Sequence, residues 1–365
     1  MKKKSILVIG PMPEPTTGVS LANKVLVEGL SSHDAYQIKV VNTSLVQFKE
    51  NLGKFSLSKF FFYLKQNLYV FKVFCVDIVY ITPGQTFFGL TKYYLYFVLT
   101  RLLRKELIVH IHGNHIGEEY RLLKGLKKIV FSFLLKKISK GIVLSESLTG
   151  NMTPFISDDK IYISYNFVED YLFVEKQMIK NKLKGIKPKV VFLSNLMEEK
   201  GIYDLLDALK ILEDKGVDYE ARIAGNIDAS QEQKLKAEFK RLKKTSYIGV
   251  VSGKPKRDLL LWANIFILPT FYKMEGQPIS ILEAMATANI ILTTRHAGIP
   301  DIFQNETNGY FVEKKKPTNI ANQIQLIDLR STQSQKISWN NYLNARKKYR
   351  QEKFINNIID IFEAQ

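Results

Sequence analysis

The sequence contains a single cysteine and no long apolar run. Because Cys75 has no second cysteine to pair with, no intramolecular disulfide can form, and we expect a reducing compartment, the cytoplasm. No stretch of 18 uncharged apolar residues occurs, which argues against a membrane-spanning helix. The basic start Met1–Lys4 and the apolar run after it resemble a secretory signal, but Pro11 and Pro13 end that run too early.

Two familiar ligand-binding patterns are also missing. The dinucleotide fingerprint G-x-G-x-x-G does not occur, which counts against a nicotinamide-dependent enzyme. There is no D-x-D triplet either, so we expect a site without a catalytic metal. Hydrophobic residues make up 46% of the chain, which is enough for full globular cores and unlike a disordered composition.

Basic residues outnumber acidic ones by 53 to 35, a net charge of +18. The densest basic segment, residues 121–140, has no acidic residue and interleaves its charges with leucine, isoleucine and phenylalanine. Its basic residues are Arg121, Lys124, Lys127, Lys128, Lys136, Lys137 and Lys140. Such a segment suits an anionic membrane surface or a diphosphate-bearing lipid, and a solvated helix face is the alternative. No nucleic-acid-binding module accompanies the charge, so nucleic acid is not an expected partner.

Short apolar runs rich in valine and isoleucine alternate with helical patterns, as in parallel sheets buried on both faces. The predicted strands span residues 6–9, 38–41, 78–81, 107–111, 141–144, 160–163, 190–193, 219–224, 245–248, 265–268, 290–293 and 309–312. Helices are predicted at 19–30, 87–103, 202–215, 231–243, 256–262, 279–286, 319–327 and 347–362. This order predicts an α/β protein with two Rossmann-like, doubly wound domains, 1–170 and 171–346, joined within a lysine-rich stretch at 169–188.

Two turns between a strand and a helix are candidates for phosphate binding. The first contains Gly18, which would let the backbone approach a ligand at a helix start, although an ordinary turn is the alternative. The second carries Glu275, then Pro278 at the predicted first helical position, and Glu283 inside the helix. The free N–H groups at this helix start, those of residues 279–281, favour a diphosphate. One carboxylate could then hold sugar hydroxyls and the other ribose hydroxyls.

The segment 275–286, E-G-Q-P-I-S-I-L-E-A-M-A, resembles the hallmark of family-4 retaining glycosyltransferases of the GT-B fold, which is a Glu, seven residues and a second Glu. Residues 191–202, which include Lys200, resemble the family's strand followed by an Arg and a Lys-Gly, except that Asn195 stands at the Arg position. The stretches 223–225, 247–250, 297–301 and 308–312 resemble further signatures of the family.

The resemblance implies roles for individual residues. Glu275 and His112, the latter within a His-Gly pair, act at the donor sugar, and Lys200 stabilises the leaving diphosphate. The donor-binding residues expected from the pattern and the resemblance are Gly18, Asn195, Lys200, Gly249, Val250, Gly276, Gln277, Pro278, Ile279, Ser280 and Glu283. Ser145 and Asn166 match family loop positions. The resemblance also implies that the terminal helix, about 347–365, packs back on the first domain.

Together these features and the resemblance predict an enzyme, a glycosyltransferase. The resemblance implies that it retains the anomeric configuration by front-face attack. Its donor would be a UDP- or GDP-sugar, bound as substrate without a further cofactor. The expected acceptor is a glycan on a polyprenyl diphosphate in bacterial O-antigen or capsule assembly, because aromatic pairs at 87–88, 93–94 and 96–97 accompany the basic charge of the first domain. A core helix is the alternative for these pairs. We expect a cytoplasmic protein, peripheral on the inner face of the membrane.

Three alternative hypotheses stay open. A zinc site could form from His110, His112 and His115, although no cysteine or acid stands at ligand spacing before Glu118. A GT-B sugar-nucleotide epimerase should carry further acid/base carboxylates aimed at the sugar. A non-catalytic protein that binds polyanions or membranes should lack the intact glutamate pair.

Overall fold

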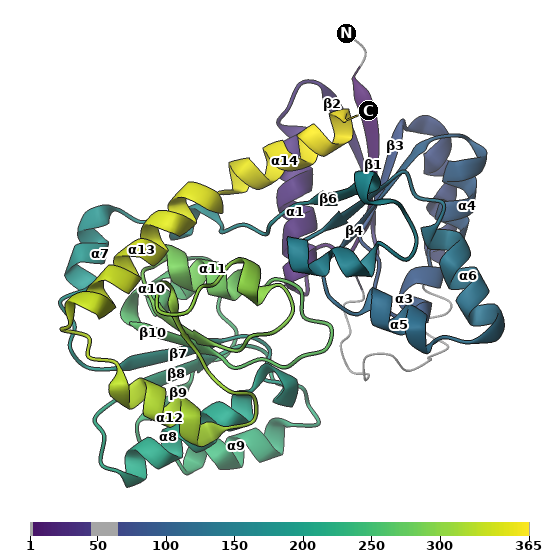
Figure 1. Ribbon diagram of the computed structural model, residues 1–365. Coiled ribbons are helices and arrows are strands. Elements are labelled where there is room, and N and C mark those ends of the chain that lie inside the picture. The colour runs from purple at the N-terminus through teal and green to yellow at the C-terminus, as the bar shows by residue number, and fades with distance from the viewer. Residues whose placement is uncertain (1–2, 45–64, 365) are drawn as a thin grey trace. The chain divides into compact units, whose positions relative to one another are not determined.

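The computed structural model describes residues 3–44 and 65–364, which form two compact units (Figure 1). The first unit comprises the described residues up to Asn166, the tetrapeptide Met274–Gln277, and the residues from Phe354 onwards. The second comprises Phe167–Lys273 and Pro278–Lys353. These limits differ from the predicted boundaries at 170 and 346, and nothing in the sequence pattern had set residues 274–277 apart from the second domain.

The first unit is built on a parallel sheet with the strand order β2-β1-β3-β4-β5-β6. Its first strand in the chain, which lies between two others, is apolar on every inner position: Ile6, Leu7, Val8 and Ile9 are fully buried. Such burial on both faces is what the consecutive apolar runs predicted. The strands are β1 (Lys4–Gly10), β2 (Tyr36–Asn42), β3 (Ile78–Ile81), β4 (Glu106–Ile111), β5 (Lys140–Val143) and β6 (Ile161–Ile163).

Helices pack on this sheet, and one predicted helix is divided in two. The elements are α1 (Gly18–Ser31), η1 (Leu68–Cys75), α3 (Phe87–Thr91), α4 (Tyr94–Leu102), α5 (Ile116–Leu122) and α6 (Gly125–Leu135). The prediction of one helix over 87–103 is wrong because the chain leaves helical geometry at Tyr93, whose buried ring places its hydroxyl 3.0 Å from Thr43 Oγ1. Tertiary packing of one tyrosine thus overrides the local helical pattern.

The last helix, α14 (Gln351–Glu363), packs on the first unit from Phe354 onwards. Gly29 of α1 leaves room for it, since a Cβ there would lie 2.3 Å from Ile355 Cδ1. Two lysines bind carbonyl groups at its C-terminal end: Lys140 Nζ donates to Ile361 O (2.8 Å) and Lys4 Nζ to Phe362 O (3.0 Å). Cations at this end satisfy carbonyls that the helix itself cannot pair.

The second unit has a parallel sheet in the order β12-β11-β10-β7-β8-β9. Figure 1 shows α8, α9 and α12 on one face of this sheet and α10, α11 and α13 on the other. Its strands are β7 (Lys189–Leu193), β8 (Glu220–Ala224), β9 (Thr245–Tyr247), β10 (Ile265–Leu268), β11 (Ile290–Thr293) and β12 (Gly309–Phe311). Its helices are α7 (Lys176–Lys182), α8 (Ile202–Asp214), α9 (Glu232–Lys240), α10 (Gly253–Trp262), α11 (Ile279–Ala286), α12 (Pro317–Leu326) and α13 (Thr332–Lys348).

A single terminal helix over 347–362 was also predicted, and this is wrong. The helix is interrupted between α13 and α14 at Tyr349, where the Val168 N–H donates to the Tyr349 carbonyl at 2.7 Å. α7 lies inside the stretch that was predicted to be a linker. This helix was not predicted because the stretch is rich in lysine, a residue that is usually exposed, whereas Lys182 is turned inward.

Each sheet reverses its direction of growth once, between β1 and β3 in the first unit and between β7 and β10 in the second. In open parallel sheets ligands bind at the carboxyl ends of the strands beside such a reversal. The two doubly wound sheets confirm the predicted α/β class, and the carboxyl ends of these strands are therefore where a site is to be sought.

Candidate functional site

The loop with Glu275 is hydrogen-bonded into the first unit. The Asn166 N–H donates to Gln277 Oε1 (2.7 Å), Asn166 Nδ2 donates to the Gln277 carbonyl (2.7 Å), and Gln277 Nε2 donates to the Leu144 carbonyl (3.2 Å). At the other end, Gln85 Nε2 donates to the Met274 carbonyl (3.1 Å). Leu144 directly follows β5, so these bonds fasten the tetrapeptide Met274–Gln277 to the carboxyl edge of the first sheet.

Gly276 brings this loop against the backbone that carries His112. A Cβ at Gly276 would lie 2.6 Å from the His112 carbonyl oxygen and 3.0 Å from Gly113 Cα, so only glycine fits without a shift. Glu275, which is 6% exposed, therefore sits one residue from this contact. The structure thus brings together Glu275, Gly276, Gln277 and His112, four of the predicted site residues, within one unit.

The His112 imidazole packs against a second histidine ring at a tilt of 34°. It lies 4.0 Å from the His110 ring between centroids, and His110 Nδ1 is 2.6 Å from the Tyr80 hydroxyl. Both His112 nitrogens are shielded from solvent and have no hydrogen-bond partner among the described residues. Burial lowers the pKa of His112 to about 3. A neutral imidazole with an unsatisfied N–H is suited to hydrogen-bond a substrate hydroxyl.

The third histidine of the predicted cluster is turned elsewhere. His115 Nδ1 lies 3.2 Å from Glu118 Oε2 and its Nε2 lies 3.4 Å from Glu119 Oε2, on the same helix α5. Within residues 3–44 and 65–364, no group of three or more His, Cys, Asp or Glu side chains is arranged to hold a metal ion.

Gly18 is the first residue of α1, at the carboxyl end of β1. Thr17 caps the helix: its hydroxyl accepts from the Ser20 N–H (3.1 Å) and the Ser20 hydroxyl accepts from the Thr17 N–H (2.7 Å). This capping box uses donors that a ligand would otherwise find at the helix start, and Gly18 itself is exposed.

In the second unit, the segments after β7 and β10 are joined beside the sheet reversal. The Phe271 N–H donates to the Glu199 carbonyl (2.7 Å), and Gly201, with φ +80°, approaches Pro269 so closely that a Cβ would lie 2.6 Å from the Pro269 carbonyl oxygen. Lys200 Nζ lies 4.9 Å from the centre of the Tyr272 ring. Asn195, where the family resemblance implied an arginine, is exposed after β7.

The predicted base-binding turn follows β9. Gly249, with φ +78°, accepts a hydrogen bond from the Gly225 N–H (2.9 Å), and the Tyr247 hydroxyl donates to the Gly225 carbonyl (2.9 Å). Val250 is 71% exposed. The carboxyl ends of β8 and β9 are thereby tied together, and Val250 is left open to solvent.

Helix α11 has the predicted bounds, 279–286, but Pro278 is its N-cap rather than its first residue. The expectation of three free N–H groups is also wrong, because the Ile281 N–H donates to the Pro278 carbonyl (3.2 Å). Ile279 and Ser280 are the two remaining candidates at this helix start. The tight first turn, closed by an i→i+3 bond, uses the third donor.

Glu283 is buried in α11 and has a partner that the sequence analysis missed. Lys256 Nζ of α10 lies 2.6 Å from Glu283 Oε1 and 2.7 Å from Glu169 Oε2. Burial raises the pKa of Glu283 and Lys256 opposes that shift, whereas the carboxylates raise the pKa of Lys256 despite its burial. The sequence could have indicated this ion pair only through a lysine within the apolar pattern of α10, but lysines on helices are usually exposed.

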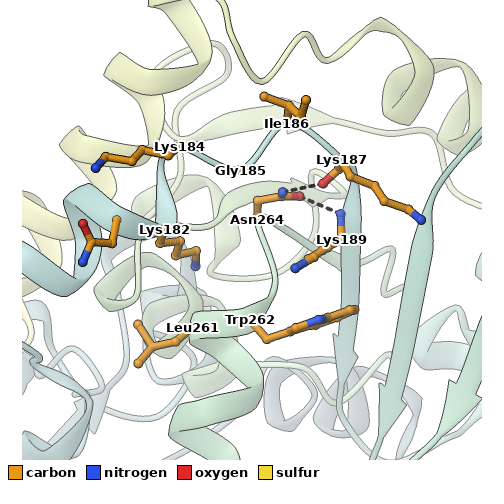
Figure 2. A pocket seen from close by; sticks show the side chains of 10 residues that line it. Lys182, Lys184, Gly185, Ile186, Lys187, Lys189, Leu261, Trp262 and Asn264 are labelled. Atoms are coloured by element: carbon orange, nitrogen blue, oxygen red, sulfur yellow. Dashed lines mark hydrogen bonds between the residues drawn. The ribbon is translucent and has the colours of Figure 1, made fainter.

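A hollow of about 380 Å³ lies at the opposite, amino ends of β7 and β10 (Figure 2). Several lysines surround it, but two of them are already bound. Lys182 donates to the carbonyls of Leu260 and Thr287 and to Asn289 Oδ1, and Lys187 pairs with Asp218 and Glu220. These lysines hold the unit together, and we assign no ligand to the hollow.

The basic segment of the first unit presents apolar side chains on two sides. Phe131, Leu134 and Leu135 of α6 are buried in the unit, whereas Leu126, Ile129 and Phe133 are exposed. The exposed lysines around them are Lys124, Lys127 and Lys136, with Lys128 and Lys137 half-buried. We call these three apolar and five basic side chains the α6 face. α3 and α4 adjoin α6 and add exposed Phe88, Tyr94, Leu95 and Leu102.

Two predictions about this surface are wrong in part. Lys140 does not belong to it, because its ammonium group is buried against Glu106 (2.7 Å) and the end of α14. Of the predicted aromatic surface, Tyr93, Tyr96 and Phe97 are core residues. No described helix is long and apolar enough to cross a membrane.

Comparison with known proteins adds sequence and fold evidence. Residues 173–343 match the family model of glycosyl transferases group 1. The putative colanic acid biosynthesis glycosyltransferase WcaL of Escherichia coli K12 is 25% identical over 143 residues, 37% of this chain and 35% of that protein. The N,N'-diacetylbacillosaminyl-diphospho-undecaprenol alpha-1,3-N-acetylgalactosaminyltransferase of Campylobacter jejuni is 26% identical over 163 residues, 44% of this chain and 41% of that protein. The chain thus spans 35% to 41% of these curated relatives.

Among solved structures, Anabaena HepE in complex with UDP is similar with a TM-score of 0.75 and 15% identity, over 99% of this chain and 100% of that one. This likeness shows the fold and confirms the predicted class, the two Rossmann-like units of GT-B proteins. The segment that matches the family model contains Lys200, Glu275 and Glu283. Over residues 173–343 the chain is similar to glycosyl transferases group 1, and this likeness supports a transferase.

Proposed function

We propose that this protein is a retaining glycosyltransferase that moves a sugar from a UDP- or GDP-sugar to a polyprenyl-diphosphate-linked glycan in bacterial surface-polysaccharide assembly. The observation that carries the proposal is the contact of the Glu275 loop with the His112 backbone at Gly276. It brings the backbone of the loop that carries Glu275 against the backbone of His112, whose neutral imidazole has unsatisfied nitrogens. The names of the relatives support the polysaccharide context.

Each half of the donor has residues suited to it. Glu275 and His112 would bind the sugar, and Lys200 with the Ile279 and Ser280 N–H groups would bind the diphosphate, because cations and helix starts attract phosphate. Glu283 would accept hydrogen bonds from ribose hydroxyls, and Gly249 with Val250 would adjoin the base. Charge that develops on the leaving diphosphate is stabilised by Lys200, which is an electrostatic contribution to the transition state.

A panel of UDP-, GDP- and ADP-sugars tests the proposal. We expect the wild-type chain to hydrolyse or transfer from a UDP- or GDP-sugar, and Glu275→Ala to lose that turnover while its unfolding transition stays close to wild type. NMR of the product should show the anomeric configuration of the donor. Wild-type turnover in Glu275→Ala would remove the assignment of Glu275, and an inverted product would remove the retaining mechanism.

We further propose that the α6 face binds the anionic inner surface of the membrane, where a polyprenyl-linked acceptor resides. Exposed Leu126, Ile129 and Phe133 would enter the interface and the surrounding lysines would contact lipid headgroups, at about 1 kcal/mol for each basic residue near the surface. The Campylobacter relative's name, which contains a diphospho-undecaprenol group, supports a lipid-linked acceptor.

Vesicle sedimentation tests the α6 face. Replacing Lys124, Lys127, Lys128, Lys136 and Lys137 by glutamine should release the protein from phosphatidylglycerol vesicles. The matched control replaces five exposed lysines of the second unit, Lys215, Lys236, Lys240, Lys243 and Lys254, and should remain bound. Leu126, Ile129 and Phe133 changed to serine should also weaken binding at unchanged charge. Equal release of the α6-face variant and the control would leave only nonspecific charge attraction.

A further inference from the structure

Lys256 is an unusual neighbour for a residue proposed to bind the donor. It lies in the first turn of α10, its side chain is 10% exposed, and its ammonium group contacts Glu283 of α11 and Glu169, which precedes the segment Asp170–Leu172. All three residues belong to the second unit. A buried ammonium group of this kind is stable only when carboxylates compensate for its lost hydration.

The geometry leaves one Glu283 oxygen for a ligand. Lys256 Nζ binds Oε1, and Oε2 has no hydrogen-bond partner in the part of the chain that the structure describes. A carboxylate held through one oxygen has a restricted rotamer, and its other oxygen can still accept hydrogen bonds. The arrangement therefore holds Glu283 in one orientation without filling its acceptor capacity.

We propose that Lys256 is a positioning residue of the donor site, which keeps Glu283 as a carboxylate and aims its free oxygen at the ribose hydroxyls of the nucleotide. This inference rests on the proposed function, since it assumes that Glu283 meets the ribose. A ribose hydroxyl donates its hydrogen more strongly to an ionised acceptor than to a neutral one, and a buried carboxyl beside Glu169 would take up a proton without a cation. The titratable groups around Lys256 are Glu283, Glu169 and the half-buried Tyr171, whose ring centre lies 5.6 Å from its Nζ.

The test compares a nucleotide with its 2′-deoxy form. The probe is UDP or GDP, whichever the wild-type chain binds, and its affinity is measured by calorimetry beside that of the 2′-deoxy nucleotide. Wild type should prefer the ribonucleotide by roughly tenfold or more, as expected for a hydrogen bond to a charged acceptor. In Lys256→Met the preference should fall below about threefold at pH 7, because a protonated Glu283 no longer accepts from the hydroxyl as a charged group.

The pH profile separates positioning from general damage. As Glu283 in Lys256→Met ionises at higher pH, the ribonucleotide preference should return, whereas the preference of wild type should change less over the same pH range, because Lys256 favours the ionised form of Glu283. Lys256→Arg, which keeps the charge, should retain most of the ribonucleotide preference. Glu169→Gln is the matched control: it breaks the other half of the same ion pair and should keep the preference. Should Lys256→Met not fold, Lys256→Gln, whose amide can donate without charge, gives the same comparison.

The outcomes distinguish this inference from the function on which it rests. If wild type binds neither UDP nor GDP, or Glu283→Gln keeps the ribonucleotide preference, the proposed function fails at its donor site. If Glu283→Gln loses the preference but Lys256→Met keeps it, Lys256 has no positioning role. Equal losses in Glu169→Gln and Lys256→Met would show a network that only supports the fold, and would also overturn the inference.

Discussion

Replacing Gly276 by alanine tests whether the Glu275 loop must lie where the structure has it. The added Cβ would be 2.6 Å from the His112 carbonyl oxygen, so the two backbones must separate by about 0.8 Å to reach the 3.4 Å of an ordinary contact. Gly276 is not among the residues with positive φ, so the effect is steric only. Overpacking of this kind costs about 1–3 kcal/mol of stability. A displacement near 1 Å can lower turnover by about 100-fold, and we expect a loss of about 10- to 100-fold in kcat.

The assay is release of the nucleoside diphosphate at saturating donor, with urea unfolding of the same samples. Gly150→Ala is the matched control in the same unit, because a Cβ at Gly150 meets nothing within 4 Å. Its free energy of unfolding should stay within about 0.5 kcal/mol of wild type and its kcat should be unchanged. Wild-type kcat in Gly276→Ala would refute the reasoning that the close approach of Gly276 and His112 positions Glu275.

Three further perturbations have defined outcomes. Gln277→Ala should destabilise the protein by about 2–3 kcal/mol in urea unfolding, since it leaves the Asn166 N–H and the Leu144 carbonyl unpaired; a change below 0.5 kcal/mol would show that these bonds contribute little. Lys182→Met removes a donor from three buried acceptors and should lower the free energy of unfolding by about 3 kcal/mol or more. Lys184→Met, beside the same hollow, should lower it by about 0.5 kcal/mol or less. Equal losses in the two variants would contradict the structural role of Lys182. Burial lowers the pKa of His112 to about 3, so between this value and the ordinary 6.5 only the unfolded chain binds the proton, and stability falls as the pH falls. From pH 7 to 5, the free energy of unfolding of His112→Asn should therefore fall by about 2 kcal/mol less than that of wild type. Parallel losses in the two proteins would show that another group titrates.

Most of the fold follows from local patterns. Each predicted strand is present, and β3, β10 and β11 have the predicted limits, because strands buried on both faces are apolar at consecutive positions. The helix breaks at Tyr93 and Tyr349 could not be predicted, since each depends on a partner far along the chain: Thr43 for the first and Val168 for the second. Local propensity carries no information about such partners.

The residues of the candidate site could be predicted from the sequence, but not which of them lie together in the structure. Glu275 and His112 were both singled out, yet the loop of Glu275 belongs to the first unit because Gln277 bonds to Asn166, 111 residues away. Lys256 escaped notice because its burial depends on Glu283 and Glu169, 27 and 87 residues distant. In a sequence, a lysine with such partners looks the same as one in solvent.

The position of α14 sets an order of events during synthesis. The first unit includes residues from Phe354 onwards, yet all of the second unit is translated before them. While the ribosome makes residues 167–353, Lys140 has Glu106 but not the α14 carbonyls, and the surface around Gly29 lacks Ile355. The first unit therefore has to remain soluble in an unfinished form until the second has been made, and a chain truncated before residue 354 would leave that surface open to chaperones or to aggregation.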